Sequence, residues 1–332
     1  IAITPAIEEV ILFLPTNYKK KYSFPCSVLF GGCGNSIRHI RLAECAFRPQ
    51  VEFSCLRSLT TLYLFEVHIT SAELGSLISN CFALEKLQLI ACGELIFLKI
   101  PLSLERLTFL RCDMLQVIES KASNLSTFKF FSGPVHLSLG ESSQVKNLDI
   151  ELPFMPNSLS YSITKLPSAV LNLETLKITS VDERVDTPMV VDKFLNLKYL
   201  NIHLAADYKA FSPTYDYFSL VSFLDASPTL QTLILSVKQN AMKHDSAFGD
   251  NLHVRQIPGH EHNRLRKVHI NGFCSAKSMV ELTCHILDNA TSLESLTVDA
   301  TFNQGTYGDS RRCDRKNSRC NPIARDMIWE AH

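Results

Sequence analysis

The side chains best suited to chemistry in this 332-residue sequence are its 11 cysteines and a group of clustered histidines. Two nine-residue stretches, LEKLQLIAC at 84–92 and LERLTFLRC at 104–112, end on a cysteine at the same place. A reactive thiol needs exposure and a basic neighbour, and this leucine pattern supplies neither. We therefore expect the cysteines at this place to be structural; they are Cys45, Cys92 and Cys112.

Two other motifs have the composition of a ligand site. GGCGN at 31–35 has glycines that could cradle a phosphate, but no Lys-Ser/Thr pair follows, so a turn is the simpler interpretation. His260 and His262, with His253 and His269 nearby, could hold a metal ion, although no cysteine or second ligand pair accompanies them. The sequence has no nucleophile elbow, no HExxH motif and no convincing acid–base pair. We expect no catalytic residues, no metal and no cofactor.

The overall composition excludes several classes of partner. The 33 basic and 33 acidic residues cancel, so neither nucleic acid nor an anionic membrane is an expected partner. No apolar run reaches the length of about 18 residues that a membrane helix needs. The cysteine count is odd and CxxC pairs are missing, which argues against a disulfide framework. We expect a reducing compartment, and hence an intracellular protein of the cytoplasm or nucleus.

The leucines follow one pattern, with apolar residues at relative positions 0, 3 and 5. Cysteine at position 8 completes it in the three instances named above. The pattern occurs twelve times, about 26 residues apart on average, within the spacing of leucine-rich repeats. The twelve instances begin at Ile7, Ile37, Leu59, Leu84, Leu104, Leu125, Val145, Leu173, Leu197, Leu230, Leu265 and Leu293.

This periodicity predicts an α/β fold, the leucine-rich-repeat solenoid. Positions 3 and 5 share one face of a short strand because side chains alternate with period two. No single repeat can bury that face, but stacked neighbours can, in a parallel sheet that grows by one strand per repeat. We expect a curved sheet with helices and loops on its convex side. The array should cover residues 1–304, and 305–332 should be a basic tail with the start of a truncated helix.

Three return segments have the sequence signals of helices. Thr70 and Glu73 form a capping box before apolar residues at helical spacing, and the helix should end near Asn80. A second box is predicted at Ser278 and Glu281, with Asn289 as the stop. A third helix is expected over 218–226, before Pro228. The long polar segments 203–229 and 236–264 should also carry loops.

The concave face of the sheet is the predicted binding surface, since positions 2, 4 and 6 point away from the core. At position 6, four successive repeats place Phe65, Ile90, Leu110 and Phe131, with Tyr63 and Lys129 beside them. An exposed apolar row with a polar rim is typical of a protein-binding site. The alternative is that the next turn covers position 6 as a second small core. A second, polar row comprises Lys177, Tyr199, Asn201 and His203.

Four segments resemble the plant F-box/leucine-rich-repeat proteins of the grass type, which carry an FBD-like C-terminal region. These are FPCSVLFGGCGNSIRHIRLAECAFRP near the start, ISNCFALEKLQLIACGEL, DYFSLVSFLDASPTLQTLIL and LRKVHINGFCSAKSMVELTCHILDNATSLESLTV. The last matches the FBD-like region, at about 260–304, and RDMIWEAH resembles the beginning of that family's final helix.

The resemblance implies a substrate receptor of SCF-type E3 ubiquitin ligases, in which repeats hold the protein substrate. The F-box that would bind the Skp adaptor, and through it the cullin, is about forty residues of helical sequence and is absent from this chain. Adaptor and cullin are therefore expected partners only if an F-box lies upstream. The alternative is a repeat scaffold or sensor fragment without a ligase role.

Overall fold

The structure is a computed structural model that describes residues 7–15, 22–29, 36–49, 56–120, 122, 124–131, 135–138, 144–151, 157–181, 183, 185–189, 192–205, 215–238, 255 and 261–300. The chain forms two compact units, residues 1–152 and 153–332. Several features of the sequence lie outside the described residues: the GGCGN stretch, lysines 19–21, His253, His260 and the expected tail at 305–332.

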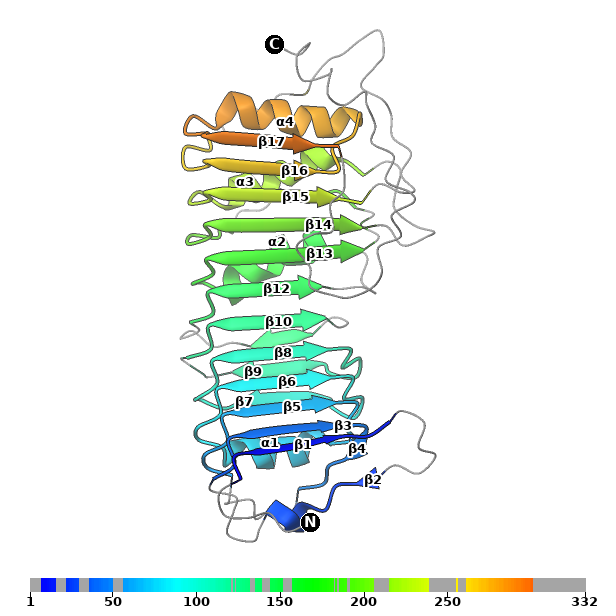
Figure 1. The fold of residues 1–332 in the computed structure, drawn as a ribbon. Helices are drawn as coiled ribbons and strands as arrows, with labels where there is room; N and C mark the ends of the chain where they lie inside the picture. Colours follow the sequence, from blue (N-terminus) through cyan, green and yellow to red (C-terminus); the bar gives the residue numbers. More distant parts are fainter. Residues whose placement is uncertain are drawn as a thin grey trace. The chain divides into compact units, whose positions relative to one another are not determined.

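The first unit contains one long parallel sheet (Figure 1). Its neighbouring strands pair without a shift, so residues at the same repeat position align across the sheet; Leu62, for example, pairs with Leu87, and Leu87 with Leu107. In spatial order the described strands are β1 (Glu9–Phe13), β3 (His39–Ala43), β5 (Thr61–Phe65), β6 (Lys86–Ile90), β8 (Arg106–Leu110), β10 (Thr127–Phe131) and β12 (Asn147–Glu151).

The second unit repeats this arrangement with its own parallel strands. They are β13 (Thr175–Val181), β14 (Tyr199–Ala205), β15 (Thr232–Val237), β16 (Lys267–Asn271) and β17 (Ser295–Asp299). Within the described residues, each of the twelve pattern instances supplies one strand to a long sheet. Positions 3 and 5 of the pattern lie within that strand. The predicted leucine-rich-repeat fold is confirmed.

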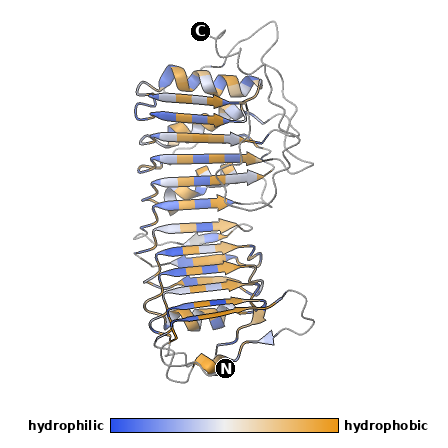
Figure 2. Cartoon of the chain, in the orientation of Figure 1, coloured by the Kyte–Doolittle hydropathy of each residue, from blue (hydrophilic) through white to orange (hydrophobic). Residues whose placement is uncertain are grey.

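The core of each unit is built from the apolar residues at positions 0, 3 and 5. In the first unit Leu59, Leu62 and Leu64 are fully buried, and the same holds for the corresponding residues of the next two repeats. Burying such a side chain contributes about 1.5–3 kcal/mol. Figure 2 shows hydrophilic and hydrophobic bands along the strands of this unit, and the sequences of β6 (KLQLI) and β8 (RLTFL) alternate over their first four residues.

A left-handed residue follows several strands, at repeat position 7, and the sequence pattern did not predict it. The described residues with positive φ at this position are Glu44, Glu66, Ala91, Arg111 and Gly272, with φ between 50° and 71°. The first four donate their backbone N–H to the position-6 carbonyl of the next strand, as Ala91 does to Leu110 at 2.8 Å. The turn directs position 8 into the core, where Cys45, Val67, Cys92, Cys112 and Phe273 are buried.

The return segments of the first unit differ from the expectation of one strand per repeat. The predicted helix is present as α1 (Ser71–Ser79), with both hydrogen bonds of the Thr70–Glu73 capping box. Three other repeats return through a second short strand, and these form a small parallel sheet: β7 (Phe97–Ile100), β9 (Val117–Ser120) and β11 (His136–Ser138). Near the N-terminal end lie the pair β2 (Tyr22–Ser23) and β4 (Cys45–Ala46) and a 3-10 turn, η1 (Cys26–Leu29).

The return segments of the second unit contain the larger helices: α2 (Ser158–Ala169), the 3-10 turn η2 (Tyr217–Leu220), α3 (Val221–Ala226) and α4 (Lys277–Asn289). The helix expected over 218–226 is confirmed as η2 followed by α3, and Asn289 ends α4 as predicted. Helix α2 was not predicted. None of the described helices is long and apolar enough to cross a membrane.

The second predicted capping box is wrong. Helix α4 already begins at Lys277, so Ser278 lies within its first turn and its hydroxyl accepts a hydrogen bond from Tyr217 N at 3.2 Å. Glu281 is buried and holds Arg255 in an ion pair. Ser278 therefore contacts η2 and Glu281 contacts Arg255, and neither side chain forms the predicted local cap.

Candidate functional site: the front face of the first unit

The predicted apolar row forms on one face of the first unit's sheet. We define the front face as the residues at positions 2, 4 and 6 of its strands, which lie opposite the core. Strand pairing places Phe65 beside Ile90, Ile90 beside Leu110, and Leu110 beside Phe131. All four are partly exposed, so they are neither core residues nor fully solvated. At a strand spacing of about 4.8 Å the four span about 15 Å.

The row continues to β1, beyond the four residues predicted from the sequence pattern. Ala43 pairs with Phe65 on one side and with Phe13 on the other. Phe13 is 58% exposed, and Ile11 beside it on β1 is 51% exposed. Both sit at front-face positions of the first pattern instance, which is the signal that could have identified them. At the other end, Glu151 pairs with Phe131 and closes the row with a carboxylate whose pKa is raised by burial.

Charged side chains of the front face divide into paired and unpaired groups. Lys129 and Asp149 form an ion pair at 3.2 Å across β10 and β12. Arg41 lies 3.5 Å from Glu9 across β1 and β3. Lys129, one of the predicted partner-binding residues, therefore has a counter-charge within the same face. Tyr63 lies on β5 as expected, partly exposed and beside Gln88 of β6.

The three repeat cysteines lie where the pattern placed them, inside the core. Cys45, Cys92 and Cys112 each have no exposed surface. The thiol of Cys92 is 3.7 Å from Leu64 O, and the thiol of Cys112 is 3.7 Å from Leu89 O, so each bridges to the preceding strand. Burial raises the pKa of Cys45 to about 11, which suppresses the reactive thiolate. This geometry suits a structural role and offers no nucleophile.

An ionic network lies between the β3 and β6 return segments of the first unit. Arg48 contacts Glu73 at 2.8 Å and Glu94 at 3.0 Å, and His68 contacts Glu94 at 2.8 Å. Arg48 and His68 therefore tie helix α1 to the turn that precedes β7. Within the described part of the chain, no group of three or more His, Cys, Asp or Glu side chains is placed to hold a metal ion.

The second unit's polar row is also formed by strand pairing. Lys177 pairs with Asn201, and Thr179 pairs with His203, so the side chains lie together on the face opposite the core. Lys177, Asn201, His203 and Tyr199 are partly exposed. Burial, with a smaller effect of Lys238, lowers the pKa of His203 and keeps it neutral near pH 7. This face offers hydrogen bonds and the partly exposed Ile234, which pairs with Asn201 and His269. Its described strands carry no aligned apolar row like that from Phe65 to Phe131.

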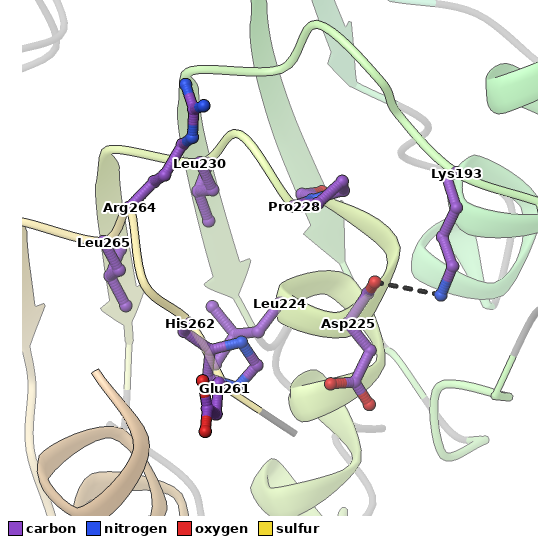
Figure 3. A pocket seen from close by; sticks show the side chains of 10 residues that line it. Lys193, Leu224, Asp225, Pro228, Leu230, Glu261, His262, Arg264 and Leu265 are labelled. Carbon is purple, nitrogen blue, oxygen red and sulfur yellow. Dashed lines mark hydrogen bonds between the residues drawn. The ribbon is translucent and has the colours of Figure 1, made fainter. Parts of the chain in front are cut away.

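Figure 3 shows a cavity of about 210 Å³ in the second unit. Its lining includes Ser227, His262 and Asp225, the residue types of a hydrolytic triad. The hydroxyl of Ser227 has no hydrogen-bond partner among the described residues, and His262 Nε2 lies 3.1 Å from His285 Nε2 instead. Lys193 Nζ, also on the lining, bonds to the backbone carbonyl of Asp225 at 3.0 Å (Figure 3). No nucleophile–base pair is assembled between Ser227 and His262.

The comparison with protein families agrees with the repeat architecture. Residues 1–332 match the family described as At1g61320/AtMIF1, LRR domain. No curated protein matches the chain. Among solved structures, the chain is similar to that of the Leptospira interrogans LRR protein LIC12759, with 14% sequence identity and a TM-score of 0.28 over 90% of this chain and 85% of that chain.

Proposed function

This chain belongs to the At1g61320/AtMIF1 leucine-rich-repeat domain family, and we propose that it binds a protein partner through the front face of its first unit. The observation that carries the proposal is the apolar row Phe65, Ile90, Leu110 and Phe131, aligned by strand pairing and partly open to solvent. Apolar side chains that converge on one exposed face typically supply the central contacts of a protein interface.

Two features of the described residues outside the row favour binding over catalysis. The repeat cysteines are buried, and the cavity of Figure 3 lacks a Ser227–His262 hydrogen bond. A stacked array also presents a broad surface whose front-face residues can change without loss of the leucine core. The role that fits these features is a repeat scaffold that holds another protein.

The test is affinity capture with matched variants. Phe65→Ser combined with Leu110→Ser should remove the partners that the wild-type chain retains, because a fully desolvated anchor contributes about 2 kcal/mol or more. Phe82→Ser combined with Leu102→Ser is the control, since these side chains are 70% and 68% exposed outside the front face. Partners lost equally from both variants, with both folded by circular dichroism, would contradict the proposal.

We further propose that the partner is a ubiquitination substrate and that the repeats belong to an SCF-type receptor in the cytoplasm or nucleus. What supports this is the resemblance of four segments to plant F-box/leucine-rich-repeat proteins with an FBD-like region at about 260–304. In that role an F-box binds the Skp adaptor, and the receptor contributes proximity between substrate and ubiquitin-conjugating enzyme. The alternative is a leucine-rich-repeat scaffold or sensor with no link to ubiquitin.

The ligase role is tested on the product of the whole gene. Co-expression with a Skp adaptor and cullin should give a complex that purifies together, and front-face partners should become ubiquitinated in its presence. A gene product that binds front-face partners but never the adaptor would contradict the ligase role and would support the scaffold role.

A further inference from the structure

The front face carries unpaired positive charge on its two central strands. Lys86 begins β6 and Arg106 begins β8, and the two residues pair directly across the strands at position 2. Neither has an ion-pair partner among the described residues, in contrast to Arg41 and Lys129 on the same face. Both are at least partly exposed. Two adjacent cations without counter-charges repel each other, and an acidic partner would relieve that repulsion.

The cations and the apolar row lie at opposite ends of the same two strands. Ile90 and Leu110 follow Lys86 and Arg106 by four residues, a distance of about 13 Å at about 3.3 Å per residue. Gln88 and Thr108 lie between them and can hydrogen-bond a peptide backbone. The centre of the front face therefore changes from basic to apolar along the strand direction.

The acidic groups nearest in the chain are Glu85 and Glu105, which directly precede the two cations. They lie at position 1, before the strands begin, and are exposed. Their counterparts in other repeats form ion pairs with one another, as Glu174 and Lys198 do at 2.8 Å. Glu85 and Glu105 form no described ion pair with Lys86 or Arg106, so the two cations keep their charge toward the front face.

We propose that the front face of the first unit recognises an acidic linear segment of a protein. The segment places an Asp or Glu side chain between Lys86 and Arg106 and an apolar side chain against Ile90 and Leu110. In an extended segment these two residues are about four positions apart, because both chains rise by about 3.3 Å per residue. This inference rests on the proposed front-face binding and adds the chemistry of the partner.

The experiment is selection from a random twelve-residue peptide library displayed on phage, with the full chain immobilised. Selected peptides that fail to bind the Phe65→Ser/Leu110→Ser variant are front-face ligands. We expect these to be enriched in Asp or Glu about four residues from a large apolar residue. Binding of a synthetic consensus peptide should weaken about fivefold with Lys86→Gln and about fivefold with Arg106→Gln, and it should weaken as ionic strength rises.

Three matched changes isolate the charge effect. Lys267→Gln alters a basic residue at the same repeat position of the second unit and should leave peptide affinity unchanged. Glu85→Gln should leave it unchanged or raise it. An Asp→Asn or Glu→Gln change in the peptide removes the attraction to both cations, so it should cost more than the loss of Lys86 alone.

The outcomes separate the two proposals. Front-face ligands without acidic enrichment, or with affinities indifferent to Lys86→Gln and Arg106→Gln, overturn the acidic-segment inference and leave front-face binding intact. Selection that yields no front-face ligand overturns both. Acidic ligands whose affinity depends on Lys86, Arg106 and the apolar row support both.

Discussion

At the scale of single residues, the left-handed turn that follows five of the described strands limits which residues the chain can accept there. A non-glycine residue with φ near +55° carries steric strain of about 1–2 kcal/mol, and Ala91 and Arg111 carry it in adjacent repeats. Hydrogen bonds from their N–H groups to the next strand offset it. The same turn at Gly272 is tighter, since a Cβ atom there would lie 2.0 Å from Val237 O.

We predict that Gly272→Ala destabilises the protein by about 2 kcal/mol or more, because the backbone of β15 would have to move. Gly75→Ala is the matched control. Gly75 lies inside α1 with nothing within 4 Å of an added Cβ, so alanine should stabilise by about 0.5–1 kcal/mol. Urea unfolding measures both changes. A neutral Gly272→Ala would show that β15 and the turn adjust freely.

A second prediction concerns the reactivity of the cysteines. With iodoacetamide at pH 8, we expect no modification of native Cys45, Cys92 or Cys112, because these thiols are buried and burial raises the pKa of Cys45 to about 11. Among the cysteines that the structure describes, Cys26 and Cys284 are partly exposed and should be modified before the buried ones. Peptide mass spectrometry before and after unfolding in urea gives the measurement. Native labelling of Cys92 as fast as that of Cys26 would contradict the structural role.

At the scale of elements, helix α1 is held at its N-terminus by one carboxylate with several partners. The Glu73 carboxylate accepts hydrogen bonds from Thr70 N at 2.8 Å and from Arg48 Nη1 at 2.8 Å. Burial works to raise the pKa of Glu73, but the hydrogen bonds from Thr70 and the ion pair with Arg48 outweigh it and lower that pKa. The helix therefore depends on an ionised Glu73.

We predict that Glu73→Gln costs about 1 kcal/mol of unfolding free energy at pH 7 and less at acid pH. Because the pKa of Glu73 is lower in the folded protein, its contribution is complete above the ordinary value of about 4.5 and is lost as pH falls through the folded pKa. Urea unfolding of both proteins from pH 7 to pH 3 tests this. Arg48→Gln should reduce the same pH dependence. If the difference in unfolding free energy between wild type and Glu73→Gln stays constant down to pH 3, an ionised Glu73 does not stabilise the helix.

Strands could be predicted from sequence wherever the same buried environment recurs at a fixed position of each repeat. Inward leucines recur at fixed positions, so the strands and the buried cysteines followed from spacing alone. The row from Phe65 to Phe131 followed from the same alternation. The local box at Thr70 and Glu73 was predictable because both hydrogen bonds form within one turn.

What sequence did not reveal depends on contacts between distant segments. Ser278 and Glu281 have the spacing of a capping box, but Tyr217 and Arg255 engage them from other return segments. Whether a front-face cation is paired depends on the neighbouring repeat, so the sequence did not distinguish the paired Lys129 from Lys86. The second strands β7, β9 and β11 stabilise one another only when their repeats are stacked.

At the scale of the whole molecule, stability should come from stacking between neighbouring repeats. A central repeat has two neighbours, whereas an end repeat has one within the described sheet. The leucines at position 5 offer a direct comparison. Leu89 on β6 has no exposed surface, and Leu12 on β1 is partly exposed, although both occupy the same place in the pattern.

We therefore predict that Leu89→Ala costs about 2–5 kcal/mol, because it leaves a cavity between two packed neighbours. Leu12→Ala should cost about 1 kcal/mol, since Leu12 is partly exposed and its truncation removes less buried surface. Ile11→Ala, 51% exposed on the front face of the same strand, is the surface control and should change stability little. Urea unfolding followed by circular dichroism ranks the three. Equal costs at Leu89 and Leu12 would mean that position along the array does not determine what a repeat contributes, and that stacking between neighbours is not the source of its stability.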